Sequence, residues 1–214
     1  MSKELTKSKA IIKAATQNDI SDIENGLLVY LDQDFYSKTD ADYLFDQLKK
    51  QVVYDIDPKI KIFGKELSIP RNQTAYGDPE TTYTFSGLTV DAKPWLPILL
   101  DIKTDVENAT GKKFNFCLIN YYADGSKYIG YHKDDERDLG SRPWIASISL
   151  GQTRKFYFKA DDPTLDVVKT ILTHGSLCIM IDPTNVHWKH SVPKETIKNC
   201  SNPRINLTFR IIQV

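Results

Sequence analysis

The chain has 214 residues, and its 28 Lys and Arg residues balance its 28 Asp and Glu residues to a formal net charge of zero. At roughly 150 residues per domain, this length predicts one domain, or one domain with a short appendage. The hydrophobic fraction of 41% and the charged fraction of 26% are those of an ordinary globular protein. These values exclude a wholly disordered chain and a strongly basic coating protein, while a nucleic-acid enzyme with a local basic patch stays open.

Targeting and redox signals predict an intracellular protein, nuclear or cytoplasmic. No apolar run approaches the roughly 18 residues of a membrane helix, and the N-terminus lacks the apolar core of a secretory signal. The cysteines form an odd, scattered set without CxxC spacing: Cys117, Cys178 and Cys200. This set argues against a disulfide framework and a cysteine zinc site. We expect reduced thiols, no membrane contact, no obligatory protein partner and a monomer.

The first half of the chain predicts helices and a hairpin. Residues 1–24 are polar and Lys-rich without a clear period, so we expect a flexible tail there and a short strand at 26–31. Helical spacing predicts a helix over 37–50, capped by Ser37 or Asp34. A hairpin is expected over 59–69. A second helix follows Pro94 and stops at Gly111.

After Gly111, apolar positions recur at every second residue. This period predicts strands at 114–122, 128–132, 144–150, 154–159, 167–171, 176–181, 187–192 and 204–212. Many short strands separated by turns are typical of a β-sandwich or barrel. We therefore predict one domain over 25–214, mainly β with flanking helices (α+β), in which 25–113 lead into a mostly antiparallel core at 114–214.

The last strand has one polar and one apolar face. Side chains two apart share a face, so one face carries Arg204, Asn206, Thr208 and Arg210 and the other carries Ile205, Leu207, Phe209 and Ile211. Either the polar face lies in water, or it lines a barrel interior in which two arginines hold an anion. In the second case an acidic ligand is expected, because a buried guanidinium needs a partner and its fork matches a carboxylate.

A candidate metal site lies upstream of that strand. His132 and Asp134 point the same way, and a His-x-Asp pair with a distant His has the spacing of the 2-His-1-carboxylate facial triad. This triad leaves positions open for a chelating cosubstrate and for oxygen. The third ligand stays open between His174, His187 and His190. His187 and His190 are an odd number of residues apart, so only one faces the interior, and His174 precedes a turn that favours a structural hydrogen bond.

Taken together, these segments resemble the AlkB family of Fe(II)- and 2-oxoglutarate-dependent dioxygenases, in particular the member that repairs alkylated double-stranded DNA. The resemblance spans about residues 59–212 and is carried by IFGKELSIPRNQTAYGD, TYTFSGL, FNFCLINYYADG, HKDDER, IASISLG, HGSLCIM, PTNVHWKHSVP and RINLTFR. It implies a double-stranded β-helix, or jelly roll, with the metal inside. An N-terminal helical and hairpin extension would recognise the nucleotide.

The resemblance also implies a reaction and its ligands. Iron would bind His132, Asp134 and His190, and 2-oxoglutarate would lie on Arg204, Arg210, Asn206, Asn120 and Tyr122. With O2, this centre would oxidise the methyl group of 1-methyladenine or 3-methylcytosine in DNA, and formaldehyde, succinate and CO2 would leave. The protein's task would be to place the methyl carbon and to exclude water.

Contacts to the nucleic acid follow from the same resemblance. A damaged base within a duplex must be flipped out, and Phe63 beside Gly64 would be the wedge that replaces it. The alternative is that Phe63 packs in the core of its hairpin. The pocket wall would be Tyr83, Phe85 and Ser86, facing the acidic pair Asp135 and Glu136, and phosphates would meet Arg71, Lys59, Lys61 and Lys65. The acidic pair could equally be a solvated turn.

Departures from the family pattern keep other substrates open. Tyr121, Tyr131 and Lys133 stand where the family favours other residues, so preference among duplex, single strand and RNA is not fixed. The alternatives are an RNA or single-strand demethylase, a protein demethylase or hydroxylase, and a binding module without activity. The last predicts a lost ligand, but all five of His132, Asp134, His190, Arg204 and Arg210 are present.

Overall fold

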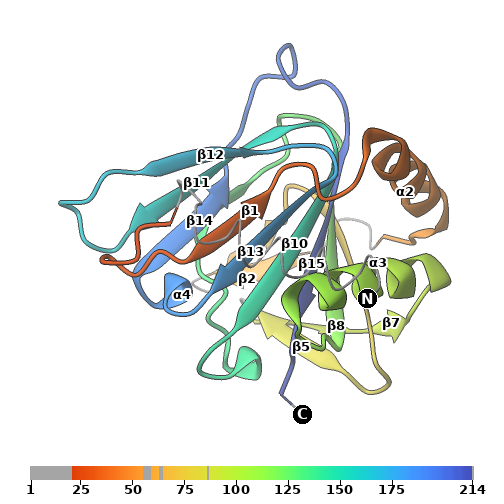
Figure 1. Cartoon of the computed structure of the whole chain (residues 1–214), viewed down its shortest axis with the longest axis horizontal. Coiled ribbons are helices and arrows are strands. Elements are labelled where there is room, and N and C mark those ends of the chain that lie inside the picture. Colours follow the sequence, from red (N-terminus) through yellow and green to blue (C-terminus); the bar gives the residue numbers. More distant parts are fainter. Residues whose placement is uncertain (1–20, 55–58, 63–64, 86, 214) are drawn as a thin grey trace, which may run out of the picture.

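The computed structural model describes residues 21–54, 59–62, 65–85 and 87–213, and it consists of two packed sheets with helices on one side (Figure 1). The hairpin residues Phe63 and Gly64, and the wall residue Ser86, lie outside the described residues. Residues 21–24, expected to belong to the tail, are joined to the fold, because Asp22 bridges to Leu27 and the Ser21 hydroxyl donates to the Val29 carbonyl.

The larger sheet has seven strands in the order β1-β13-β10-β15-β8-β4-β7. Its members are β1 (Val29–Asp32), β13 (Ser176–Ile181), β10 (Trp144–Gly151), β15 (Arg204–Arg210), β8 (Phe116–Tyr122), β4 (Asn72–Gly77) and β7 (Lys93–Pro94). Neighbours are antiparallel except for β4 and β7. This mostly antiparallel order matches the predicted barrel.

The smaller sheet has four strands in the order β12-β11-β14-β9. They are β12 (Val168–Leu172), β11 (Arg154–Ala160), β14 (Trp188–Val192) and β9 (Ile129–His132). Two hairpins form two-stranded sheets of their own: β2 (Lys59–Ile62) with β3 (Lys65–Ser68), and β5 (Thr82–Phe85) with β6 (Leu88–Asp91). Phe156 and Phe158 of the smaller sheet share a core with Leu118, Ile145 and Met180 of the larger one, so the two sheets pack face to face.

Two helices cover the outer face of the larger sheet: α2 (Lys38–Gln51) and α3 (Pro97–Thr110) (Figure 1). Leu44 and Leu48 of α2 and Ile102 of α3 share a core with Ile205 and other apolar side chains of β15. Two short helical segments, η1 (Arg137–Leu139) and α4 (Thr184–His187), lie in loops. The apolar face of the last strand is thus buried under helices, and its polar face turns toward the smaller sheet.

The helix ends partly match the sequence prediction. Ser37 caps α2 by accepting a hydrogen bond from the Asp40 amide, as expected, and Gly111 ends α3 in a left-handed conformation. The expected start at Pro94 is wrong, because Pro94 pairs with Gly77 in the parallel β7 and α3 begins at Pro97. A proline suits the first turn of a helix, since its missing amide hydrogen is not needed there. Pro97 takes this position in α3, and the sequence alone did not distinguish it from Pro94.

Four strands before residue 95 have no clear signature in the sequence: β4, β5, β6 and β7. In β4, Gln73, Thr74, Ala75 and Tyr76 are all buried, so the strand does not alternate between apolar and polar residues. Among the described residues, no helix is both long and apolar enough to cross a membrane.

Candidate active site

A hollow opens between the two sheets and receives the polar face of β15. Arg204 and Arg210 are 1% and 5% exposed, so the polar face is buried in the barrel interior, as the second alternative predicted. The hollow is lined from the larger sheet by β4, β8, β10, β13 and β15 and from the smaller sheet by β9, β11 and β14. The hairpin β5–β6 closes one side with Tyr83 and Phe85.

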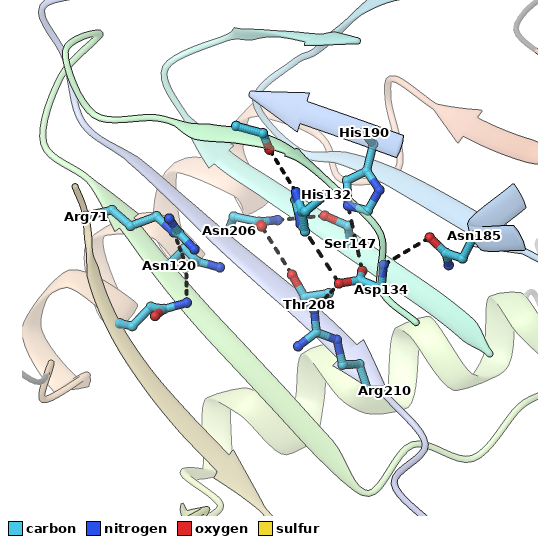
Figure 2. Close-up of polar contacts among 12 residues, drawn as sticks. Arg71, Asn120, His132, Asp134, Ser147, Asn185, His190, Asn206, Thr208 and Arg210 are labelled. Atoms are coloured by element: carbon cyan, nitrogen blue, oxygen red, sulfur yellow. Dashed lines mark hydrogen bonds and ion pairs between the residues drawn. The ribbon is translucent and has the colours of Figure 1, made fainter. Parts of the chain in front are cut away.

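The metal-ligand candidates His132, Asp134 and His190 meet at the small sheet (Figure 2). His132 and His190 are directly opposite each other on β9 and β14, and one ligand atom from each of the three residues lies within 4.8 Å of the others. His187 lies at the end of α4 and is exposed. His174 sits elsewhere: its Nδ1 accepts from the Gly151 amide, and its Nε2 lies 3.0 Å from Asp42.

Hydrogen bonds fix how two of these ligands, His132 and Asp134, are presented. The His132 Nδ1 donates to the Gly130 carbonyl at 3.0 Å, which leaves the Nε2 lone pair directed at the cluster, 4.0 Å from Asp134 Oδ1. The His190 Nε2 lies 3.8 Å from Asp134 Oδ2. The backbone amide of Asp134 donates to Asn185 Oδ1 of α4 at 3.2 Å, so α4 holds the carboxylate's loop in place (Figure 2).

The protonation states suit metal binding. Burial alone would raise the pKa of Asp134, but the positive charge of Arg210 and the two imidazoles outweigh it and hold that pKa below its ordinary value. Burial, and then the neighbouring His132, lowers the pKa of His190 to about 3, and burial lowers the pKa of His132 as well. A carboxylate with two neutral imidazoles is the donor set of the facial triad that holds non-haem Fe(II).

Next to the triad, two arginines have nitrogens without partners. Arg210 Nη2 donates to Asp134 Oδ1 at 2.7 Å, and Arg204 Nη2 donates to Ser149 Oγ at 2.9 Å. The Nε and Nη1 atoms of both are buried without a hydrogen-bond partner in the described chain. The buried Arg154 is better satisfied, because Nη1 and Nη2 donate to three backbone carbonyls and its Nε, which makes no hydrogen bond in the described chain, lies 3.4 Å from Glu195 Oε1. Arg204 has no carboxylate partner in the described chain, and an uncompensated buried cation is costly. Its free donors, together with the free Nε and Nη1 of Arg210, fit a dicarboxylate anion such as 2-oxoglutarate.

The other expected cosubstrate residues surround these arginines. The Tyr122 ring lies under the Arg204 guanidinium at 5.1 Å, and Asn120 lines the hollow. Asn206 lines it too, but its amide nitrogen already donates to Ser147 Oγ and to the Ile148 carbonyl. This residue is therefore a structural anchor as well as a candidate contact.

A second part of the hollow is walled by aromatic and acidic side chains. Tyr83 is buried, its ring lies on the Arg210 guanidinium at 4.6 Å, and Phe85 is beside it at 5.5 Å between centroids. The Tyr83 hydroxyl and Glu136 Oε2 are both buried, and these two side chains interact with each other. Burial, and then the charge of Asp134, raises the pKa of Glu136. A buried hydroxyl and a buried carboxyl beside aromatic walls suit a heterocyclic ring with its own polar edge.

The structure separates some residues that the sequence grouped. Asp135 is exposed and does not line the hollow, whereas Glu136 does, because the chain turns between them. Arg71 is also inside: its Nε donates to Asn120 Oδ1 at 2.7 Å, so it does not stand among the surface cations with which it was grouped. The side chains of Lys59, Lys61 and Lys65 lie outside the described residues.

Several lining residues were not among the site residues predicted from the sequence. Gln73, Ser147, Thr208, Phe156, Cys178 and Met180 line the hollow. Thr208 follows from the alternation of the last strand, and Ser147 from its place opposite Thr208 on β10. Cys117, Cys178 and Cys200 are free and buried, as expected.

Comparisons with known proteins bear on this geometry. A family model described as the 2OG-Fe(II) oxygenase superfamily matches residues 28–210. The proteins named DNA oxidative demethylase ALKBH2 from Bos taurus and Homo sapiens are each 46% identical to the chain over 186 residues, which cover 83% of this chain and 66% and 70% of those proteins. A solved structure titled "The structure of OsALKBH1" aligns with a TM-score of 0.61 at 17% identity, over 86% of this chain and 96% of that one. The last comparison concerns the fold alone.

Proposed function

Because the chain belongs to the AlkB family within the 2OG-Fe(II) oxygenase superfamily, we propose that it removes methyl groups from ring nitrogens of alkylated bases in DNA. As a family member it is a dioxygenase that uses Fe(II), 2-oxoglutarate and O2. The proposed substrates are 1-methyladenine and 3-methylcytosine, within duplex DNA. The names of its relatives support DNA as the polymer.

The metal and cosubstrate have proposed places in the hollow. His132, Asp134 and His190 would hold Fe(II), and Arg204 and Arg210 would bind the carboxylates of 2-oxoglutarate, with Asn120, Tyr122 and Asn206 around them. When bound, this set supplies the oxidation of a methyl C–H bond, coupled to conversion of 2-oxoglutarate into succinate and CO2. The hydroxymethyl product on a ring nitrogen is a hemiaminal, which breaks down to formaldehyde and the unmodified base.

The observation that carries the proposal is the aromatic and acidic half of the hollow beside the triad. Tyr83 and Phe85 would hold the base between them and the imidazole of His132, and Arg71 would border the nucleoside. Glu136 would meet the polar edge of the ring. Both proposed bases are cations when methylated, so a carboxylate at this place favours them over the neutral base. Phe63, Gly64, Ser86 and Asp135 remain proposed nucleic-acid contacts on the family resemblance alone.

The protein's own contribution is placement. The flipped base enters a site from which water is excluded, and its damaged pairing lowers the cost of flipping. We also propose that the chain works as a monomer.

The test uses purified protein with Fe(II), 2-oxoglutarate and ascorbate, and a duplex oligonucleotide that carries one 1-methyladenine. Loss of the methyl mass should occur with wild type and vanish with Asp134→Ala. Matched single-stranded DNA, RNA and a methylated peptide rank the alternatives. Succinate formation without loss of methyl from any nucleic acid would leave the metal centre in place and refute the substrate.

A further inference from the structure

Three amide side chains form a row across the larger sheet. Gln73 of β4 lies opposite Asn120 of β8, and Asn120 lies opposite Asn206 of β15. All three line the hollow, and they are 3%, 5% and 8% exposed. Gln73 lies within the family-like segment IFGKELSIPRNQTAYGD, but the residues of that segment do not predict its contact with Asn120. Its place in the row is set by strand register alone.

Two hydrogen bonds fix the orientation of the middle amide. Asn120 Oδ1 accepts from Arg71 Nε at 2.7 Å (Figure 2). It also accepts from Gln73 Nε2 at 2.9 Å. An arginine Nε can only donate, so the atom that faces it must be the amide oxygen. Both lone pairs of that oxygen are then filled. The amide nitrogen of Asn120 is therefore turned away from both donors, and it has no hydrogen-bond partner among the described residues.

We propose that Gln73 is a positioning residue for 2-oxoglutarate, because together with Arg71 it holds Asn120 with its N–H donors facing the anion. This rests on the proposed cosubstrate role of Asn120. The outer torsion of an Asn side chain is soft and roughly two-fold. A free amide could present its oxygen to a carboxylate and repel it. Two donors on the oxygen remove that alternative.

Stability does not explain glutamine at this place. Gln73 Oε1 is buried without a partner in the described chain, which is unfavourable for folding. Met, with a similar shape and no polar atoms, would avoid that cost. Arg71 alone is not equivalent, because its Nη1 is also directed at the Tyr128 carbonyl, at 3.4 Å, and the side chain borders the proposed nucleoside site. Among the described residues, the Gln73 side chain makes its one hydrogen bond to Asn120.

The experiment measures binding of 2-oxoglutarate by isothermal titration to Mn(II)-loaded full-length protein under nitrogen, without nucleic acid. Gln73→Met should weaken Kd about tenfold, the effect of one ordinary hydrogen bond. Gln73→Glu should weaken it further, because an ionised carboxylate accepts only and draws the Asn120 nitrogen away. The control is Thr74→Val, a buried neighbour on β4 whose hydroxyl accepts from Lys93. It should change Kd less than about twofold while lowering the melting temperature comparably.

A double-mutant cycle separates this role from the site assignment. Asn120→Ala should weaken Kd, and adding Gln73→Met to it should cost nothing further. If Asn120→Ala leaves Kd unchanged, the proposed cosubstrate site is wrong and the inference falls with it. If Asn120→Ala weakens binding but both Gln73 variants bind normally, or if Thr74→Val weakens binding equally, only the positioning role is overturned. If the Gln73→Met protein does not fold, the Kd of Gln73→Glu for 2-oxoglutarate tests the positioning role instead.

Discussion

Replacing Arg210 with Met should destabilise the metal-free protein, and the loss should shrink as the pH falls. Arg210 Nη2 lies 2.7 Å from Asp134 Oδ1, and the two side chains are 6% and 3% exposed. Removing one partner of a buried ion pair costs about 3–5 kcal/mol. For a chain of 214 residues, that corresponds to a melting temperature lower by roughly 6–20 °C, at about 2–4 °C per kcal/mol.

The pH dependence follows from Asp134. In the wild type, Arg210 and the imidazoles keep its pKa low against the effect of burial, and without the guanidinium burial raises it. A raised pKa means that the folded variant takes up a proton more readily than the unfolded chain. The deficit is therefore complete at about pH 8 and is relieved as the pH falls through that raised pKa.

Thermal unfolding of wild type and variant at about pH 8 and about pH 5.5 measures both effects. The exposed Arg142→Met serves as control and should change the melting temperature by less than about 2 °C. Adding Asp134→Asn to Arg210→Met should restore part of the stability, since no buried charge is then left alone. A deficit that is equal at both pH values, or smaller than about 1 kcal/mol, would refute the reasoning.

Four further outcomes are expected. The pKa of His190 is about 3 in the fold but about 6.5 when unfolded, so only the unfolded chain gains a proton as pH falls from 7 to 5. Metal-free stability should then drop by about 2 kcal/mol in denaturant titrations, and His190→Gln should flatten that slope; an unchanged slope contradicts the assignment. Mn(II) at about 100 times its Kd should stabilise wild type by about 2.7 kcal/mol but leave the melting temperature of Asp134→Ala unmoved; an equal shift places the metal elsewhere. Glu136→Gln should slow repair of 3-methylcytosine about tenfold while the KM for 2-oxoglutarate stays constant, and normal repair would remove Glu136 from the site. Phe63→Ala should reduce activity on duplex far more than on single strands, and equal losses would exclude the wedge.

Alternation along a strand predicted the most informative part of the site. The last strand carries polar and apolar residues on separate faces, and the structure buries both faces, the polar one around the hollow and the apolar one under the helices. The same rule could not choose between His187 and His190. That choice depends on the helical turn α4, which ends at His187 before the strand begins. Trp188 could have indicated that His190 faces the interior, because side chains two positions apart share a face of the strand and a large apolar residue such as Trp188 is buried.

Local patterns could not predict contacts made by register. Gln73 meets Asn120 although 47 residues separate them in sequence, and β4 lacks alternation because it is buried throughout. The position of Arg71 has the same cause. Near a predicted hairpin it looks like a surface cation, but it precedes a buried strand that carries it into the hollow. Tertiary pairing decides such positions, and no spacing within one segment reports it.

The Tyr83 ring rests on Arg210, and the same guanidinium holds Asp134. The hairpin β5–β6 is also hydrogen-bonded to the segment that follows Asp134, because the Thr84 amide donates to Asp138 Oδ2 at 3.0 Å. Substrate range and oxidative chemistry are thus not separable modules in this protein. Grafting a hairpin from a relative to change the accepted lesion would also alter the charge balance at the metal, so new specificity has to evolve in step with the residues that surround Arg210.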